Sequence, residues 1–457
     1  MLHRLDRRTV RYSTQAVFLS LVFCSLLAGC RTTGSGPPVT QAAQTAPQVS
    51  GPVGEGAIGV GLTAALFAMP QVRAAISSAR AARLQVAVAA SAQNSKVHVE
   101  GSVGFAGDSA QGMERAARVS VTGERPLVDF GQTDRRVALA ALRAEIAQQQ
   151  ARGAIDAALA NVLRQFGKRR SAARTLTIID HYLTLYHARA ALIEAAVASG
   201  VMSTSDVLEI KALKNQILSQ RAKADLAKQV SSTALKLALE PQYDAAIADL
   251  RSGVDALAPP SFEIPNSVAA RLVQLRQSDA RLQIELEANA GKPVGHFRTS
   301  VTSPTFDDPD TSLFAGVTFA LPVKDGGVAK AKIAGLEKAL AKLGHEQVLL
   351  EQTSKLAQSE WQSFAKFYEV ETTLLEQRLR ISRARVEALE LRLRAGRTDV
   401  KTLVKEILSS AQSQVAQVEL QGDLLSQSIK AAVKVQSTCT LIRLCGDIAT
   451  IFEGLPP

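Results

Sequence analysis

One short phrase occurs twice in this chain of 457 residues, and the distance between its copies constrains the fold strongly. Residues 125–131 read RPLVDFG and residues 321–327 read LPVKDGG, so proline, aspartate and glycine recur at one spacing, 196 positions apart. A proline that opens a helical stretch and a glycine inside helical sequence recur at nearly the same offset. These pairs are Pro70 with Pro265 and Gly200 with Gly396. The chain is therefore an internal duplication, with repeats at 58–264 and 265–440.

Each repeat contains an exceptionally long stretch without proline. Residues 132–199 and 328–395 are helical in composition, and such a helix extends about 100 Å at about 1.5 Å per residue. An ordinary globular helix has about 11 residues, so these lengths indicate a coiled coil or a helical tube. We expect two shorter helices, stacked end to end, beside each long one. Their ranges are about 62–92 with 206–239, and about 268–290 with 399–435.

Two segments alternate apolar and polar residues with a period of two, which is the signal of a strand. They predict β-hairpins at about 96–122 and about 295–321. The strands have the length of transmembrane barrel strands, about 9–11 residues. Four strands cannot close a barrel, and open edges cannot stand in lipid. Several copies must therefore combine, as a dimer with eight strands or a trimer with twelve, and counting alone does not choose.

The doubled phrase lies where a strand meets a long helix. Proline lacks an N–H and is expected to end the strand ladder, glycine permits the turn, and aspartate caps the helix that follows. The junction residues are Pro126, Asp129 and Gly131 in the first repeat, and Pro322, Asp325 and Gly327 in the second.

The first thirty residues are typical of an export signal. A basic segment precedes a short apolar run that ends in Leu-Ala-Gly before Cys30. This sequence resembles a bacterial lipoprotein cleavage site, which implies a signal peptide at 1–29 and a lipid-bearing Cys30. Residue 31 is Arg rather than Asp, so the resemblance implies the outer membrane. Residues 30–57 read as a flexible tether. The alternative is a plain secretory signal with an incidental cysteine.

The cysteines, the net charge and the motifs that are missing narrow the possible functions further. Cys439 and Cys445 are six residues apart, which permits a disulfide in an oxidising compartment without settling it. Removal of the signal lowers the net charge from +11 to +8, which we interpret as solvated helix faces, because no nucleic-acid-reading motif accompanies it. The sequence shows no catalytic constellation, cofactor motif or metal-site spacing. We expect a protein that is not an enzyme, with a C-terminal segment at 441–457.

The chain resembles a known family over residues of about 58–440. The stretch LFAGVTFALPVKDGG, the Pro70 and Pro265 helix openings, and the Gly200 and Gly396 breaks are similar to those of the TolC-type outer-membrane efflux and secretion proteins, especially the lipidated branch. The resemblance implies a mainly α fold with a small β part. It also implies a homotrimer with a 12-stranded barrel, a periplasmic helical tunnel, and docking to a periplasmic adaptor and an inner-membrane pump.

The same resemblance implies roles for the hairpin tips, where family members close the tunnel. Asp206 matches an aspartate that the family uses in tip contacts, whereas Thr402 and Lys405 occupy positions where some members carry acidic rings. The gate candidates are therefore Asp206, Arg397 and Asp399, and helix capping by the two aspartates is the alternative. The adaptor-docking candidates are Ser199, Gly200, Val201, Met202, Ala395, Gly396, Arg397 and Thr398.

The sequence leaves two possible functions. The preferred one is a passive exit duct for an efflux pump or a type I secretion system. The other is a non-conducting periplasmic coiled-coil lipoprotein that acts as a scaffold, against which the paired hairpins argue.

Overall fold

The computed structural model describes residues 59–108, 112–263, 267–304, 312–320, 326–396 and 398–446, which belong to one compact unit. Several predictions fall outside these ranges. They concern the signal peptide, Cys30 and the whole tether, together with Pro265, Pro322, Asp325, Arg397 and residues 447–457.

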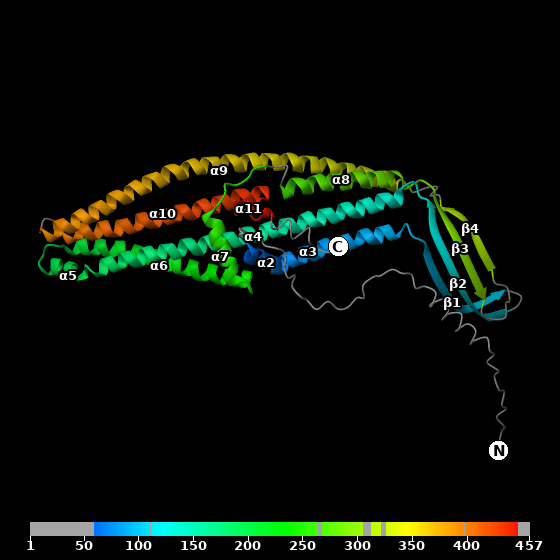
Figure 1. Ribbon diagram of the computed structural model, residues 1–457, viewed down its shortest axis with the longest axis horizontal. Helices are drawn as coiled ribbons and strands as arrows, with labels where there is room; N and C mark the ends of the chain where they lie inside the picture. Colours follow the sequence, from blue (N-terminus) through cyan, green and yellow to red (C-terminus); the bar gives the residue numbers. More distant parts are fainter. Residues whose placement is uncertain are drawn as a thin grey trace, which may run out of the picture. The chain divides into compact units, whose positions relative to one another are not determined.

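The helices and strands follow the duplicated order (Figure 1). The first repeat contains α2 (Val60–Ala68), α3 (Pro70–Ser91), β1 (Lys96–Asp108), β2 (Gly112–Val128), α4 (Gln132–His187), α5 (Ala190–Ala198), α6 (Thr204–Leu239) and α7 (Tyr243–Asp255). The second contains α8 (Val268–Ala288), β3 (Val294–Pro304), β4 (Ser312–Ala320), α9 (Val328–Arg394), α10 (Val400–Val435) and α11 (Thr438–Leu441). Within the described ranges, no single helix is long and apolar enough to cross a membrane, and only the bent pair α2–α3 meets that test jointly.

The long helices lie beside pairs of shorter ones, as the helix lengths predicted. α4 packs against both α3 and α6, and α9 packs against both α8 and α10 (Figure 1). α4 also contacts α8 and α10, which joins the two repeats. The helices therefore form rows in the order α3 with α6, then α4, then α8 with α10, and finally α9. The two end rows are α3 with α6, and α9.

Two buried apolar clusters hold these rows together. The first lies where α2, α4, α6 and α7 meet, and the second lies between α4, α6 and α10 toward their other end. Burial of such side chains drives the packing, since each contributes about 1.5–3 kcal/mol. Fully buried members include Leu66, Ile155, Leu159, Leu235 and Leu250 in the first cluster, and Ile179, Ile210, Ile217 and Leu403 in the second.

The four strands form one antiparallel sheet in the order β1–β2–β3–β4. Val99 pairs with Val121, Val121 with Val301, and Val301 with Leu313, so one row across the sheet is wholly apolar. The next row, on the opposite face, runs through Glu100, Ser120, Thr302 and Ser312. Val99 and Leu313 are 61% and 76% exposed. One face of the sheet is thus mainly apolar, and it is uncovered.

The strand-to-helix junction differs in part from the prediction. β2 continues through Pro126 to Val128, with a bulge between these residues, so Pro126 shifts the register and does not end the ladder. A bulge accommodates a residue without an N–H. The Asp129 carboxylate accepts hydrogen bonds from the backbone N–H groups of Gly131 at 3.0 Å and Thr133 at 2.8 Å. Gly131 and Gly327 both have positive φ, which glycine adopts without strain.

One helical prediction was wrong, and one helix was not predicted. The helix expected at 132–199 ends at His187, and α5 begins at Ala190 after a break at 188–189. No proline or glycine marks this break, and the Arg189 side chain there bonds to the Leu185 carbonyl and to Glu390 of α9. The sequence also gave no indication of α7, which packs against α2.

Candidate functional site

The candidate site is formed by the two helix-hairpin turns, residues 199–203 and 395–399, and the first turns of α6 and α10, which we call the tip. Gly200 and Gly396 have φ values of 70° and 65°, so each hairpin turns at a glycine in the left-handed region. Ser199, Gly200 and Val201 are exposed, as are Ala395 and Gly396, and Thr398 is half-buried. Met202 is only 5% exposed and belongs to the second cluster, so its side chain serves packing rather than surface contact.

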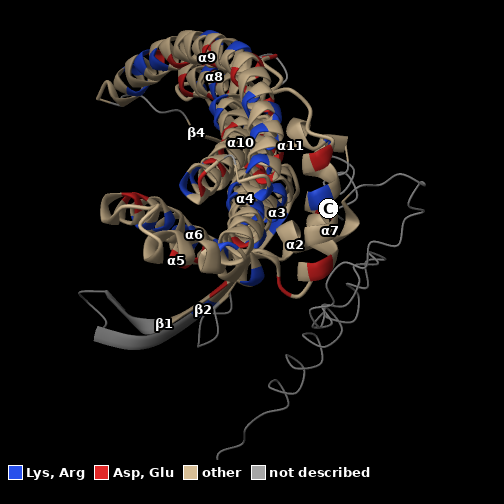
Figure 2. Cartoon of the chain, turned by 90° about the vertical axis from the view of Figure 1, so that its left-hand side faces the viewer, with Lys and Arg blue, Asp and Glu red and all other residues tan. Residues whose placement is uncertain are grey.

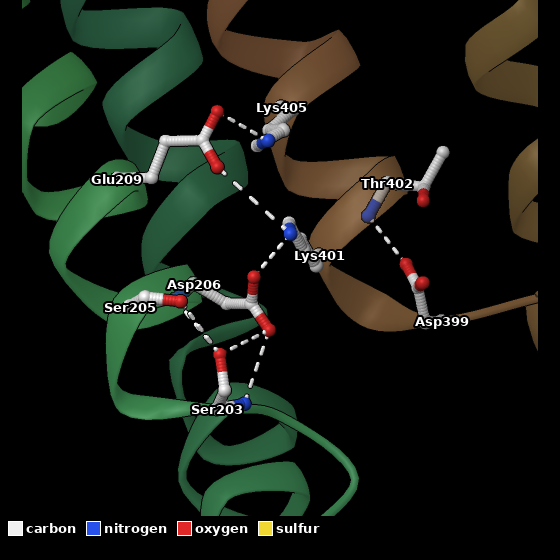
Figure 3. Close-up of polar contacts among 8 residues, drawn as sticks. All are labelled: Ser203, Ser205, Asp206, Glu209, Asp399, Lys401, Thr402 and Lys405. Carbon is white, nitrogen blue, oxygen red and sulfur yellow. Dashed lines mark hydrogen bonds and ion pairs between the residues drawn. The ribbon is translucent and has the colours of Figure 1, made fainter.

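Asp206, in the first turn of α6, forms a capping box with the N-cap residue Ser203 (Figure 3). Its carboxylate accepts hydrogen bonds from the Ser203 backbone N–H at 3.0 Å and from the Ser203 hydroxyl at 2.7 Å. The Asp206 N–H in turn donates to the Ser203 hydroxyl at 3.2 Å. This reciprocal pattern satisfies N–H groups that a helix start otherwise leaves unpaired.

Asp206 also joins the two hairpins, because its second carboxylate oxygen pairs with Lys401 of α10 (Figure 3). Glu209, one turn further along α6, lies 3.8 Å from the Lys401 ammonium group and pairs with Lys405. Two carboxylates of the first repeat thus face two ammonium groups of the second. We call these four residues the tip ion-pair network.

The Lys401 partner lowers the pKa of Asp206 to about 2, with further lowering by the Ser203 hydrogen bonds. The Asp206 hydrogen bond correspondingly raises the pKa of Lys401. Both groups therefore stay charged at neutral and mildly acidic pH, and the Asp206–Lys401 ion pair holds across that range.

Asp399 has a different role from Asp206. It is the N-cap of α10, and its carboxylate accepts the Thr402 backbone N–H at 2.6 Å (Figure 3). Bonding to Thr402 lowers the pKa of Asp399. Of the three gate candidates, the structure places Asp206 in the cross-hairpin network and Asp399 in a cap, and Arg397 lies outside the described residues.

Sequence reasoning missed most of the network. Glu209 and Lys401 were not singled out, and Lys405 was noted only where some relatives carry an acid. Residues 206 and 209 lie three apart on α6, and 401 and 405 lie four apart on α10. These are the spacings of residues on one helix face, so opposite charges on two facing helices were the available signal.

Cys439 and Cys445, whose pairing the sequence left open, form a disulfide. The loop between them buries Leu441 and Leu444 in the first cluster. The Cys439 N–H donates to the buried Asp156 of α4 at 3.0 Å, and burial raises the pKa of that aspartate. This ring lies far from the tip and has a structural role. No group of three metal-ligating side chains occurs within the described ranges.

Comparisons with known proteins bear on the fold. No protein-family model and no curated protein sequence matches the chain. Solved structures do match. The outer membrane protein VceC from Vibrio cholerae superposes with a TM-score of 0.69 at 14% identity, covering 81% of this chain and 94% of that one.

Two further channels give similar results. The CmeC outer membrane channel of Campylobacter jejuni gives a TM-score of 0.67 at 11% identity, covering 86% of this chain and 88% of that one. The open state of the MtrE outer membrane channel of Neisseria gonorrhoeae gives 0.63 at 15% identity, covering 82% and 87%. The chain therefore has the fold of the TolC-type outer-membrane channels, the family that its sequence resembles.

Proposed function

We propose that this protein is an outer-membrane channel-tunnel, the passive exit duct of a tripartite efflux pump or a type I secretion system. One observation carries the proposal, namely the open four-stranded sheet with an uncovered apolar face. In water such a face and two unpaired edges are unfavourable. In a bilayer the apolar face suits lipid, and the edges require further strands.

The end rows of helices also support the association of several copies, which would complete the barrel. α3 precedes the edge strand β1 in the chain and shares its row with α6, whereas α9 follows the edge strand β4. Both end rows carry exposed apolar side chains. They are Leu84, Val88, Leu226, Val230 and Leu237 in α3 and α6, and Val348, Leu349, Phe367 and Val370 in α9.

A contact between the α9 row of one copy and the α3–α6 row of the next would bury both apolar rows and pair β4 with β1. A contact between two different faces closes a ring when its rotation allows. The fold that this chain shares is consistent with a homotrimer, in which twelve strands close the barrel and the helices form a periplasmic tunnel.

The tip ion-pair network is the proposed gate. It ties α6 to α10, so the two hairpins cannot separate while Asp206 and Glu209 remain paired with Lys401 and Lys405. The periplasmic adaptor would dock at the exposed tip residues, and the inner-membrane pump would supply the energy. Export through the predicted signal and a lipid on Cys30 would anchor the protein in the outer membrane.

The test is the conductance of the purified full-length protein in a planar lipid bilayer. Discrete steps are expected, and Lys401→Gln should raise the fraction of time spent open because it removes two of the ion pairs. Lys342→Gln is the matched control, since it removes an exposed charge that pairs only within α9. Silence from the wild type and from Lys401→Gln alike would favour the non-conducting lipoprotein scaffold.

A further inference from the structure

The basic residues of α9 are divided sharply by type. Its six lysines all lie at or before Lys366, and its six arginines all lie at or after Arg378, nearer the tip. The arginines are Arg378, Arg380, Arg383, Arg385, Arg392 and Arg394, and all are exposed. A solvated helix face needs only charge, which lysine supplies equally well. Arginine is the better residue where a planar carboxylate is bound, because its guanidinium group offers a fork of donors.

These arginines form two sets with different neighbours. Arg380, Arg383 and Arg394 each have a glutamate four residues away, on the same side of the helix. Arg378, Arg385 and Arg392 recur at intervals of seven, which places them in one line on the helix. We call these three residues the arginine stripe. Their neighbours at three and four residues are Leu374, Leu375, Ile381, Ser382, Ala388, Leu389, Ala395 and Gly396, and none is acidic.

The stripe lies on the flank of α9 opposite the one that faces the first hairpin, beside the buried Leu375 and Ser382. Glu390 pairs with Arg189 at the break between α4 and α5, so the flank of α9 that carries the glutamates faces the first hairpin. Arg392 is two residues further on, about 200° around the helix at about 100° per residue. The described residues show no ion pair of Arg378, Arg385 or Arg392. Arg392 lies in the last turn, where the helix dipole favours a cation, but that reason does not extend to Arg378 or Arg385.

The α3–α6 end row of a second copy offers little to replace the missing acids. α3 contains three arginines and no acidic residue. In α6, Asp206 and Glu209 are already held by lysines, and Asp225 accepts a hydrogen bond from Gln229. The other charges of α6 toward the tip are mainly basic, including the exposed Lys211, Lys223 and Lys228. A neighbouring end row would therefore repel the arginine stripe, so its partner is a different molecule.

We propose that the arginine stripe is a docking surface for an acidic helical segment of another protein. Fourteen residues separate Arg378 from Arg392, which is about 21 Å of helix at about 1.5 Å per residue. A partner helix with carboxylates at heptad spacing presents them at the same intervals, and the exposed Leu374, Ile381 and Ala388 beside the stripe would contact its apolar side chains. This inference rests on the proposed function, in which the tip half of the tunnel meets a periplasmic adaptor.

The experiment measures binding of a fluorescent helical peptide to the purified full-length protein in detergent. The peptide is about four heptads long, with glutamates at heptad spacing, and a second peptide has glutamine at those positions. The wild type should bind the acidic peptide alone, more weakly as salt rises. The triple variant Arg378→Gln, Arg385→Gln and Arg392→Gln should bind it about tenfold more weakly, since three ion pairs are lost. The matched control is Arg380→Gln, Arg383→Gln and Arg394→Gln, which loses the same charge and should bind as the wild type does.

Other outcomes would overturn the proposal. Equal weakening in both triple variants would mean that binding follows net charge, and no binding to the wild type would mean that the surface is solvated. Stripe-dependent binding to vesicles of anionic phospholipid, without binding to the peptide, would assign the stripe to a lipid surface. Conductance of each variant in a planar bilayer keeps the two proposals distinct. Normal channel steps with lost peptide binding separate docking from conduction, and peptide binding without conductance would refute the channel alone.

Discussion

Replacing both cysteines of the Cys439–Cys445 disulfide by serine should destabilise the protein measurably. The bond closes a short ring with a sequence separation of 6. Loop-closure entropy for such a ring amounts to about 2 kcal/mol at about 25 °C, a factor of about 30 in the ratio of folded to unfolded chain. The ring is embedded in the fold, because Ala258 N–H donates to the Leu441 carbonyl at 2.9 Å and the Cys439 N–H donates to Asp156. Opening it therefore frees a segment that is hydrogen-bonded to two residues of the first repeat.

The assay is denaturant unfolding of the full-length protein, followed by circular dichroism with and without a thiol reductant. The wild type should lose stability on reduction. The double serine variant should match the reduced wild type and should not respond to reductant. If the variant unfolds at the same denaturant concentration as the oxidised wild type, the ring contributes no stability and the entropic reasoning fails. A response of the variant to reductant would show that the reductant acts elsewhere.

Three further predictions concern helix packing, the tip and the export signal. Gly61→Ala should destabilise the folded protein by about 1–3 kcal/mol at the α2–α7 contact, because a Cβ there would lie 2.8 Å from the backbone carbonyl carbon of Ala245. Gly335→Ala is the control, because open space surrounds that glycine. Thermal unfolding of the two variants measures the difference in stability. The folded-state pKa of Asp206, about 2, lies below its ordinary 3.8, so its stabilisation is present above about pH 4 and is lost as the pH falls toward 2. Channel opening should therefore be constant from about pH 8 to pH 5 and rise only below about pH 4; a rise near pH 6 would assign gating to other groups. Cys30→Ala should abolish metabolic lipid labelling, and persistent labelling would contradict the lipoprotein prediction.

The sequence alone determined the features that depend on local pattern. Period-two alternation located both hairpins, and the glycines at 200 and 396 located both turns, because a strand face and a left-handed turn are chosen by residues near in sequence. The long helices followed from uninterrupted helical composition. Their pairing with shorter helices followed from length, since a long apolar seam must be covered along its whole extent.

Only the tertiary structure decided the contacts between distant residues. Asp206 and Lys401 are 195 positions apart, and no local pattern indicates that their helices bring them together. The break at 188–189 contains no helix-breaking residue and coincides with the contact between Arg189 and Glu390, 201 positions away. The pairing of Cys439 with Cys445 was equally open, because six residues of spacing permit a bond without requiring one. Local sequence thus set the elements, and the packing of one repeat on the other set the tip network and the arginine stripe that it leaves without acids.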